Sequence, residues 1–99
     1  MLRLVDNGSP GDLAYRVPFV VDRSRAPWYV LHNRGTERIR GVTLSMLGSG
    51  RLLWGLPTAL EPDDHLRFRV HGDDIARDSV LLVRWFRPTD EEYLWRFSF

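Results

Sequence analysis

Apolar and polar residues alternate along most of this chain with a period of two, not the 3.6 of a helix. The pattern is clearest in HLRFRVH at 65–71, where Leu66, Phe68 and Val70 share one side. Strict alternation predicts a strand with one buried face. Similar patterns occur at 14–22, 27–33, 41–47, 80–87 and 93–99, and weaker ones at 1–5 and 51–55.

Segments rich in Gly, Pro, Asn and Asp separate these runs, as expected for turns. No segment of twelve or more residues has a helical period, although 72–78 is compatible with one helical turn. Pro18 cannot donate to a strand ladder, so the segment around it is expected to be an edge strand or to carry a break. We therefore predict an all-β fold for residues 1–99: a single immunoglobulin-like β-sandwich of seven to eight mostly antiparallel strands.

The last twenty residues, VLLVRWFRPTDEEYLWRFSF, predict a β-hairpin whose register depends on its loop. An even loop would mix arginine into both faces, and burying unpaired arginine is costly. An odd loop, for instance 88–92, would pair Trp85 with Trp95 and produce one fully apolar face. That face is predicted to be core: Leu81, Val83, Trp85, Tyr93, Trp95, Phe97 and Phe99.

The opposite face of this hairpin combines arginine with apolar residues. It carries Leu82, Arg84, Phe86, Leu94, Arg96 and Ser98, and the neighbouring strand is expected to add Ile39, Thr43 and Ser45. Aromatic and arginine side chains are enriched in protein interfaces. The alternative is that arginine stems cover apolar side chains in water. If this face binds a partner, its predicted contact centre is Arg84, Phe86, Leu94 and Arg96.

A second polar stripe lies along 65–71 and consists of His65, Arg67, Arg69 and His71. It could bind an anion, or it could be a solvated face paired with nearby carboxylates at 63–64, 73–74 and 90–92. His65 and His71 lie about 20 Å apart along a strand, too far to share a metal. The acidic pair at 73–74 lacks the spacing of a calcium loop. No metal site is therefore predicted.

Two tryptophans in turn-proximal positions need separate interpretations. Trp54, beside Gly55, could stack on a sugar ring or plug an open end of the sandwich. Trp28 follows Pro27 at a strand start and is predicted to be core. A carbohydrate-binding module with Trp54 as its platform is the alternative function.

No catalytic or cofactor signature is present. The chain has no G-x-S-x-G turn, and GSG at 48–50 is too short to cradle a phosphate. It has no cysteine, which excludes thiolate metal sites and disulfides. We predict a protein that is not an enzyme and uses no cofactor.

Charge and hydropathy narrow the range of partners. The net charge is +1, so no global field attracts nucleic acid, and all fourteen basic residues are arginine. No apolar run approaches the ~18 residues that span a membrane. The start, MLRLVDNGSPGDL, has no apolar region typical of a signal peptide, so a cytoplasmic location is expected.

Residues 27–99 resemble the bacterial immunoglobulin-like and fibronectin-III-like accessory modules. Asn33 and Gly35 match an Asn-x-Gly turn, and Gly41-Val42 matches the strand that follows; Pro62-Asp63 departs from the usual Pro-Gly step. The resemblance covers about three quarters of the chain and implies a fold, but it transfers no active site. The predicted function is a protein-interaction or structural module that uses an outer sheet face to contact a protein partner or a second copy.

Overall fold

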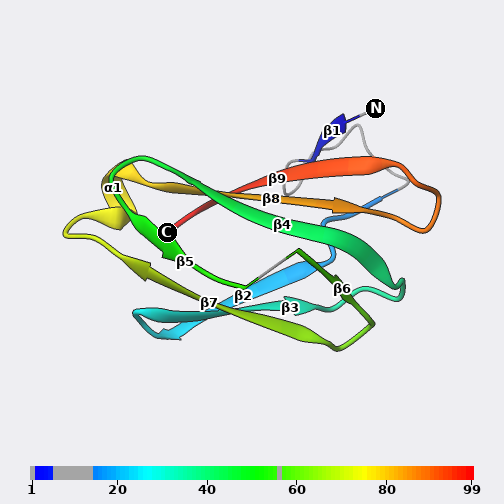
Figure 1. Cartoon of the computed structure of the whole chain (residues 1–99), viewed down its shortest axis with the longest axis horizontal. Helices are drawn as coiled ribbons and strands as arrows, with labels where there is room; N and C mark the ends of the chain where they lie inside the picture. Colours follow the sequence, from blue (N-terminus) through cyan, green and yellow to red (C-terminus); the bar gives the residue numbers. More distant parts are fainter. Residues whose placement is uncertain (1, 6–14, 56) are drawn as a thin grey trace.

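Alternating apolar residues form two β-sheets that pack face to face (Figure 1). The computed structural model describes residues 2–5, 15–55 and 57–99. Its strands are β1 (Leu2–Val5), β2 (Phe19–Arg25), β3 (Trp28–Asn33), β4 (Ile39–Leu47), β5 (Arg51–Leu53), β6 (Thr58–Leu60), β7 (His65–His71), β8 (Val80–Phe86) and β9 (Glu92–Ser98); the helix α1 (Ile75–Asp78) precedes β8. β6 was not predicted, because its three residues lie within a segment rich in turn-forming residues.

The strand order is that of an immunoglobulin-type sandwich. One sheet has the order β2-β3-β7-β5 and the other β1-β9-β8-β4-β6. The first sheet corresponds to strands ABED and the central β9-β8-β4 to strands GFC. β1 and β6 extend the second sheet at its edges, and among the described pairs only β1–β9 is parallel. The predicted all-β sandwich is confirmed, and the described residues form nine strands instead of the predicted seven or eight.

The core lies between the sheets and is rich in aromatic side chains. Trp85 and Phe68 are its largest fully buried members. Phe19 meets the Trp85 ring edge-on at 4.9 Å between centroids, which is a favourable aromatic geometry. Phe19 opens β2, directly after Pro18, and β2 is an edge strand as predicted. No helix in the described residues is long and apolar enough to cross a membrane.

The C-terminal hairpin has the predicted odd loop but a different register. Trp85 pairs with Tyr93 and Val83 with Trp95, so the loop runs over 87–91 rather than 88–92. The Arg87 amide donates to the Glu91 carbonyl at 3.0 Å and closes that loop. A shift of two residues preserves which side chains share a face. The predicted core face is therefore correct, while the predicted Trp85–Trp95 pair is wrong.

A bulge in β4 overturns one predicted outer-face residue. The β4–β8 register shifts between Arg40 and Thr43, and Gly41 lies between them at φ +61°. The extra residue reverses the side-chain alternation along β4. Ile39 is therefore fully buried in the core, whereas Thr43 is on the outer face opposite Arg84.

Candidate functional site

The outer face of the five-stranded sheet brings the four predicted contact residues together. Arg84 lies directly opposite Leu94, and Leu82 lies opposite Arg96. Phe86 and Leu94 are half-buried, while Arg84 and Arg96 are exposed. The side chains form one patch, as the sequence predicted.

This patch is already partly occupied by contacts within the chain. Arg84 pairs with the carboxylate of Glu92. The Arg40 guanidinium lies over the Phe86 ring at 5.1 Å and pairs with Asp90. Arginine stems and heads thus cover the apolar side chains here, as the alternative interpretation of this face expected.

The outer face of the four-stranded sheet carries several arginines that have no carboxylate partner among the described residues, and we call it the Trp28 face. The inner positions of β3 and β7 are buried, so the intervening residues point outward. The strand register arranges the outward residues in rows. The Trp28 face consists of Val20, Asp22, Arg25, Trp28, Val30, His32, Arg51, Leu53, His65, Arg67, Arg69 and His71, and it holds all three histidines of the chain.

Trp28 is the exposed aromatic residue at the centre of this face. Its side chain is 41% exposed, so its predicted place in the core is wrong. Tyr29 and Leu31 occupy the inner side of β3, which leaves Trp28 on the outer side opposite Arg69. The guanidinium carbons of Arg67 and Arg69 lie 4.8 and 5.6 Å from the indole centroid, within the range of cation–π contacts.

The arginines of the Trp28 face have no carboxylate within ion-pair distance among the described residues. This holds for Arg25, Arg51, Arg67 and Arg69. The expected pairing of this stripe with neighbouring carboxylates is therefore wrong in the described part of the chain. The Arg69 Nε atom is also buried without a hydrogen-bond partner. Buried donors usually have partners, so an unsatisfied one at an exposed face is unusual.

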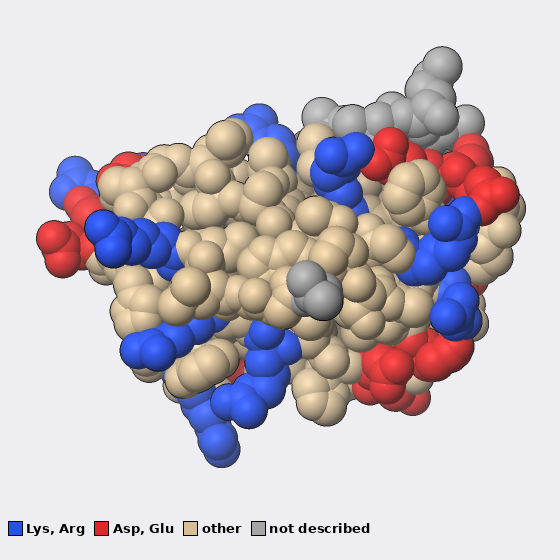
Figure 2. All heavy atoms as spheres, viewed as in Figure 1, with Lys and Arg blue, Asp and Glu red and all other residues tan. Residues whose placement is uncertain are grey.

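Charge is distributed unevenly over the molecule. Four arginines and Asp22 give the Trp28 face a formal charge of +3 with neutral histidines, so the rest of the +1 chain carries −2. Figure 2 shows several basic side chains at the lower left, on the side where β7 and the β2–β3 hairpin run in Figure 1, while other basic groups lie along the top and at both ends and the acidic groups lie toward the two ends. A nearly neutral chain thus has a locally basic face.

Exposed leucine and valine add apolar area to the same face. Leu53 is 58% and Val20 is 56% exposed. Leu53 completes a row that runs across the sheet through Arg69 and Trp28 to Arg25. Trp54, the predicted sugar platform, is instead partly buried and packs against the core.

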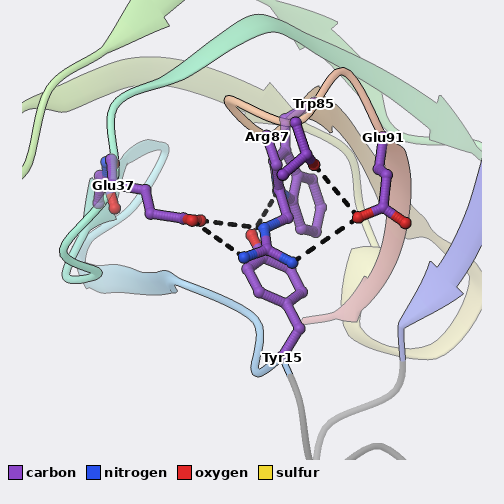
Figure 3. Close-up of polar contacts among 7 residues, drawn as sticks. Tyr15, Glu37, Trp85, Arg87 and Glu91 are labelled. Atoms are coloured by element: carbon purple, nitrogen blue, oxygen red, sulfur yellow. Dashed lines mark hydrogen bonds and ion pairs between the residues drawn. The ribbon is translucent and has the colours of Figure 1, made fainter.

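A polar cluster closes one end of the sandwich (Figure 3). Arg87 donates to both carboxylate oxygens of Glu37, and its guanidinium lies 4.1 Å from the Tyr15 ring centroid. The Tyr15 hydroxyl accepts a hydrogen bond from Trp85 Nε1 at 2.8 Å. A surface cavity of about 390 Å³ lies beside the cluster.

The titration of this cluster does not suit acid–base catalysis near neutral pH. Burial raises the pKa of Tyr15 to about 12. Hydrogen bonds to Glu37 raise the pKa of Arg87 further above its ordinary value. A general acid or base works best when its pKa lies near the operating pH. The contacts of the cluster join the end of β8 to the segments that precede β2 and β4, which is a structural role.

The opposite end has a second cavity, of about 460 Å³, bordered by Arg51, His71 and the acidic residues around α1. Asp78 accepts hydrogen bonds from Ser49 and Ser79, which lower its pKa. In the described ranges, no three His, Asp or Glu side chains are close enough to hold a metal ion.

Comparison of the chain with protein-family models, curated proteins and solved structures found no match. The resemblance to immunoglobulin-like accessory modules therefore stays a prediction. The polar stripe at 65–71 was recognised in the sequence, but its partner Trp28 was missed, because the two segments meet only through the β3–β7 pairing. The sequence carried no signal that places Trp28 on the outer face, because both alternating sets of this strand contain apolar residues: Trp28 and Val30 in one, Tyr29 and Leu31 in the other.

Proposed function

We propose that this chain is a non-enzymatic interaction module that binds a partner protein through the Trp28 face. The single observation that carries this proposal is the exposed Trp28 beside Arg67 and Arg69, two arginines with no carboxylate partner among the described residues. Tryptophan and arginine are the residues most enriched in binding hot spots.

The geometry favours the Trp28 face over the patch around Arg84. On the five-stranded sheet, Arg84 is already paired with Glu92, so a partner that binds Arg84 would have to displace that contact, and Arg96 is the one arginine of the predicted contact centre without an ion pair among the described residues. On the Trp28 face, the exposed apolar groups Leu53 and Val20 flank cations without such a pair. Desolvating the apolar groups while the guanidiniums bind carboxylates would stabilise a complex.

Carbohydrate binding is less well supported than protein binding. A sugar platform needs one open face of an exposed ring. Trp54 packs against the core, and two guanidiniums lie over the ring of Trp28. A sugar that stacked on Trp28 would therefore have to share the ring with two guanidiniums, and Trp54 is engaged with the core.

Two exposed leucines provide a matched test of which face binds. Leu53 lies on the Trp28 face, and Leu47 lies on the outer face of the five-stranded sheet; they are 58% and 54% exposed. A photo-crosslinking amino acid placed at each position, in cells that produce the protein naturally, should yield a protein adduct at position 53 only. Trp28→Ala should abolish that adduct. Adducts formed only from position 47 would refute the proposal in favour of the Arg84 patch.

A further inference from the structure

We infer that the Trp28 face recognises a short acidic segment of its partner, bound along β7 with its carboxylates on the unpaired arginines. This inference rests on the proposed function and specifies the chemistry of the ligand. It is carried by three observations: the positive charge without carboxylate partners, the row of guanidinium and apolar groups across the sheet, and the acidic residues that border the face.

The first observation is that arginines without a carboxylate partner are concentrated on this face. Five arginines elsewhere have carboxylate partners within the chain: Arg38, Arg40, Arg77, Arg84 and Arg87. The four on the Trp28 face have none among the described residues. Arg16, Arg34 and Arg96 also lack one there, so the distinguishing feature of the Trp28 face is that four such arginines lie together on one sheet surface. Guanidinium groups bind carboxylates in a planar, two-pronged geometry, which is roughly twice as strong as a neutral hydrogen bond. The missing carboxylates are therefore the groups that a ligand would supply.

The second observation is the arrangement of donors and apolar groups in one row. Arg25, Trp28, Arg69 and Leu53 lie on four adjacent strands in register, and Arg67 is one row further along β7. Neighbouring strands lie about 4.8 Å apart, so the row is about 14 Å long. Arg69 Nε is buried within it and lacks a partner. An acidic ligand that also carries an apolar side chain would complement both the arginines and the apolar groups of this row.

The third observation limits the length of the ligand and its class. Asp63 and Asp64 precede β7, and Asp73 and Asp74 follow it. β7 has seven residues, so the basic region between these pairs is about 20 Å long. A nucleic acid carries phosphates continuously and would meet the carboxylates at both ends. A short acidic peptide with uncharged flanks meets only the arginines.

Fluorescence anisotropy with a labelled nine-residue peptide tests the inference directly. The peptide carries five consecutive Asp or Glu residues at its centre and Gly or Ser at its ends. We expect it to bind the intact chain, and we expect Arg67→Glu with Arg69→Glu to weaken binding at least 30-fold. The milder Arg67→Gln, which keeps the side-chain bulk, should weaken it about 5-fold. The matched control, Arg84→Glu with Arg96→Glu on the other sheet, should change it less than 3-fold.

Three further measurements test whether binding needs the acidic side chains, whether it depends on salt, and whether single-stranded DNA binds as well. A peptide in which Gln and Asn replace Glu and Asp should not bind. Raising the ionic strength from about 0.05 to 0.3 M should weaken the acidic peptide at least 5-fold, because exposed charges are screened. Single-stranded DNA of equal length should bind more weakly than the peptide; tighter DNA binding would overturn the inference. So would a stable dimer abolished by the Arg67→Glu and Arg69→Glu changes, since a second copy would then occupy the face.

The crosslinking experiment distinguishes failure of the inference from failure of the proposed function. If position 53 crosslinks a partner but no acidic peptide binds, the face is an interface and the inferred ligand chemistry is wrong. If neither result is obtained, both are wrong. Circular dichroism and the urea midpoint of each variant must match the parent chain before its binding is compared.

Discussion

Arg87 donates a hydrogen bond from Nε to Glu37 Oε1 at 3.0 Å and another from Nη2 to Glu37 Oε2 at 2.9 Å. The two residues are fifty positions apart and join the end of β8 to the turn before β4. Their side chains are only 18% and 34% exposed, so water screens the pair incompletely. This two-pronged contact anchors the end of the sandwich that Figure 3 shows.

Replacing Arg87 with alanine should lower the free energy of unfolding by about 2 kcal/mol. Hydrogen bonds to charged groups contribute roughly 1.5–3 kcal/mol, and the Glu37 carboxylate would lose its partner. Urea unfolding followed by tryptophan fluorescence measures the change. The matched control is Arg38→Ala, whose pair with Glu61 is 59% and 51% exposed and should contribute less than about 1 kcal/mol. Equal losses from both variants would contradict the assigned role of Arg87.

Ionisation of Tyr15 should lower the stability of the protein between about pH 10 and pH 12. Burial raises its pKa in the folded chain to about 12 from an ordinary 10.0. Tyr15 therefore ionises at a lower pH in the unfolded chain than in the folded chain. The stability that neutral, buried Tyr15 contributes is fully present below pH 10 and is lost as the pH rises toward 12. Urea midpoints at pH 8, 10 and 11 should fall more steeply for the parent chain than for Tyr15→Phe. Parallel pH profiles would show that Tyr15 ionises normally.

Much of the fold could be predicted because the alternation is local. The sequence places Leu66, Phe68 and Val70 on one side of a strand whatever its neighbours are, and all three face the core. The hairpin face was also predictable, since the parity of the loop determines it. The exact register could not be predicted, because it depends on whether the loop begins at Arg87 or at Pro88. Both loops have five residues, so both leave the same side chains on the core face.

The candidate site was harder to predict because it forms across strands. Ile39 was predicted on the outer face, but a bulge at Gly41 reverses the side-chain alternation along β4. A glycine in the sequence does not by itself predict a bulge. Trp28 was misplaced because both faces of β3 carry apolar residues, so the pattern does not decide which face is buried. Its neighbours Arg67 and Arg69 come from β7, about forty residues later, and only the sheet order brings them together.

Gly41 is predicted to be intolerant of a side chain. Its φ of +61° is strained for L-residues by about 1–2 kcal/mol, and a Cβ there would lie 2.9 Å from the Phe86 ring. Gly41→Ala should therefore destabilise the fold by at least about 1 kcal/mol in thermal or urea unfolding. Gly55→Ala is the control, because nothing lies within 4 Å of a Cβ built at that position. If both substitutions were neutral, the β4 bulge would have to be more adaptable than its geometry indicates.

Asn33 should be the least replaceable polar residue of the described core. It is fully buried, and its Nδ2 lies 3.0–3.2 Å from the carbonyl oxygens of Glu37, Leu60 and Glu61, while its Oδ1 accepts from the Gly35 amide at 3.0 Å. Asn33→Asp keeps the shape but turns the donor into an oxygen that faces three carbonyls. A buried acceptor without donors costs about 1–3 kcal/mol, and more if it is charged.

The Asn33→Asp variant should also acquire a pH dependence that the parent lacks at this position. Burial and the facing carbonyl oxygens disfavour the ionised form, so the pKa of the new carboxyl rises above its ordinary value of ~3.9. Its protonated form can still donate one hydrogen bond to a carbonyl. The variant is therefore expected to lose stability relative to the parent as pH rises from about 4 to 7. Asn33→Ala should be destabilised by a constant amount over that range, and a parallel profile for Asn33→Asp would mean that water reaches this site.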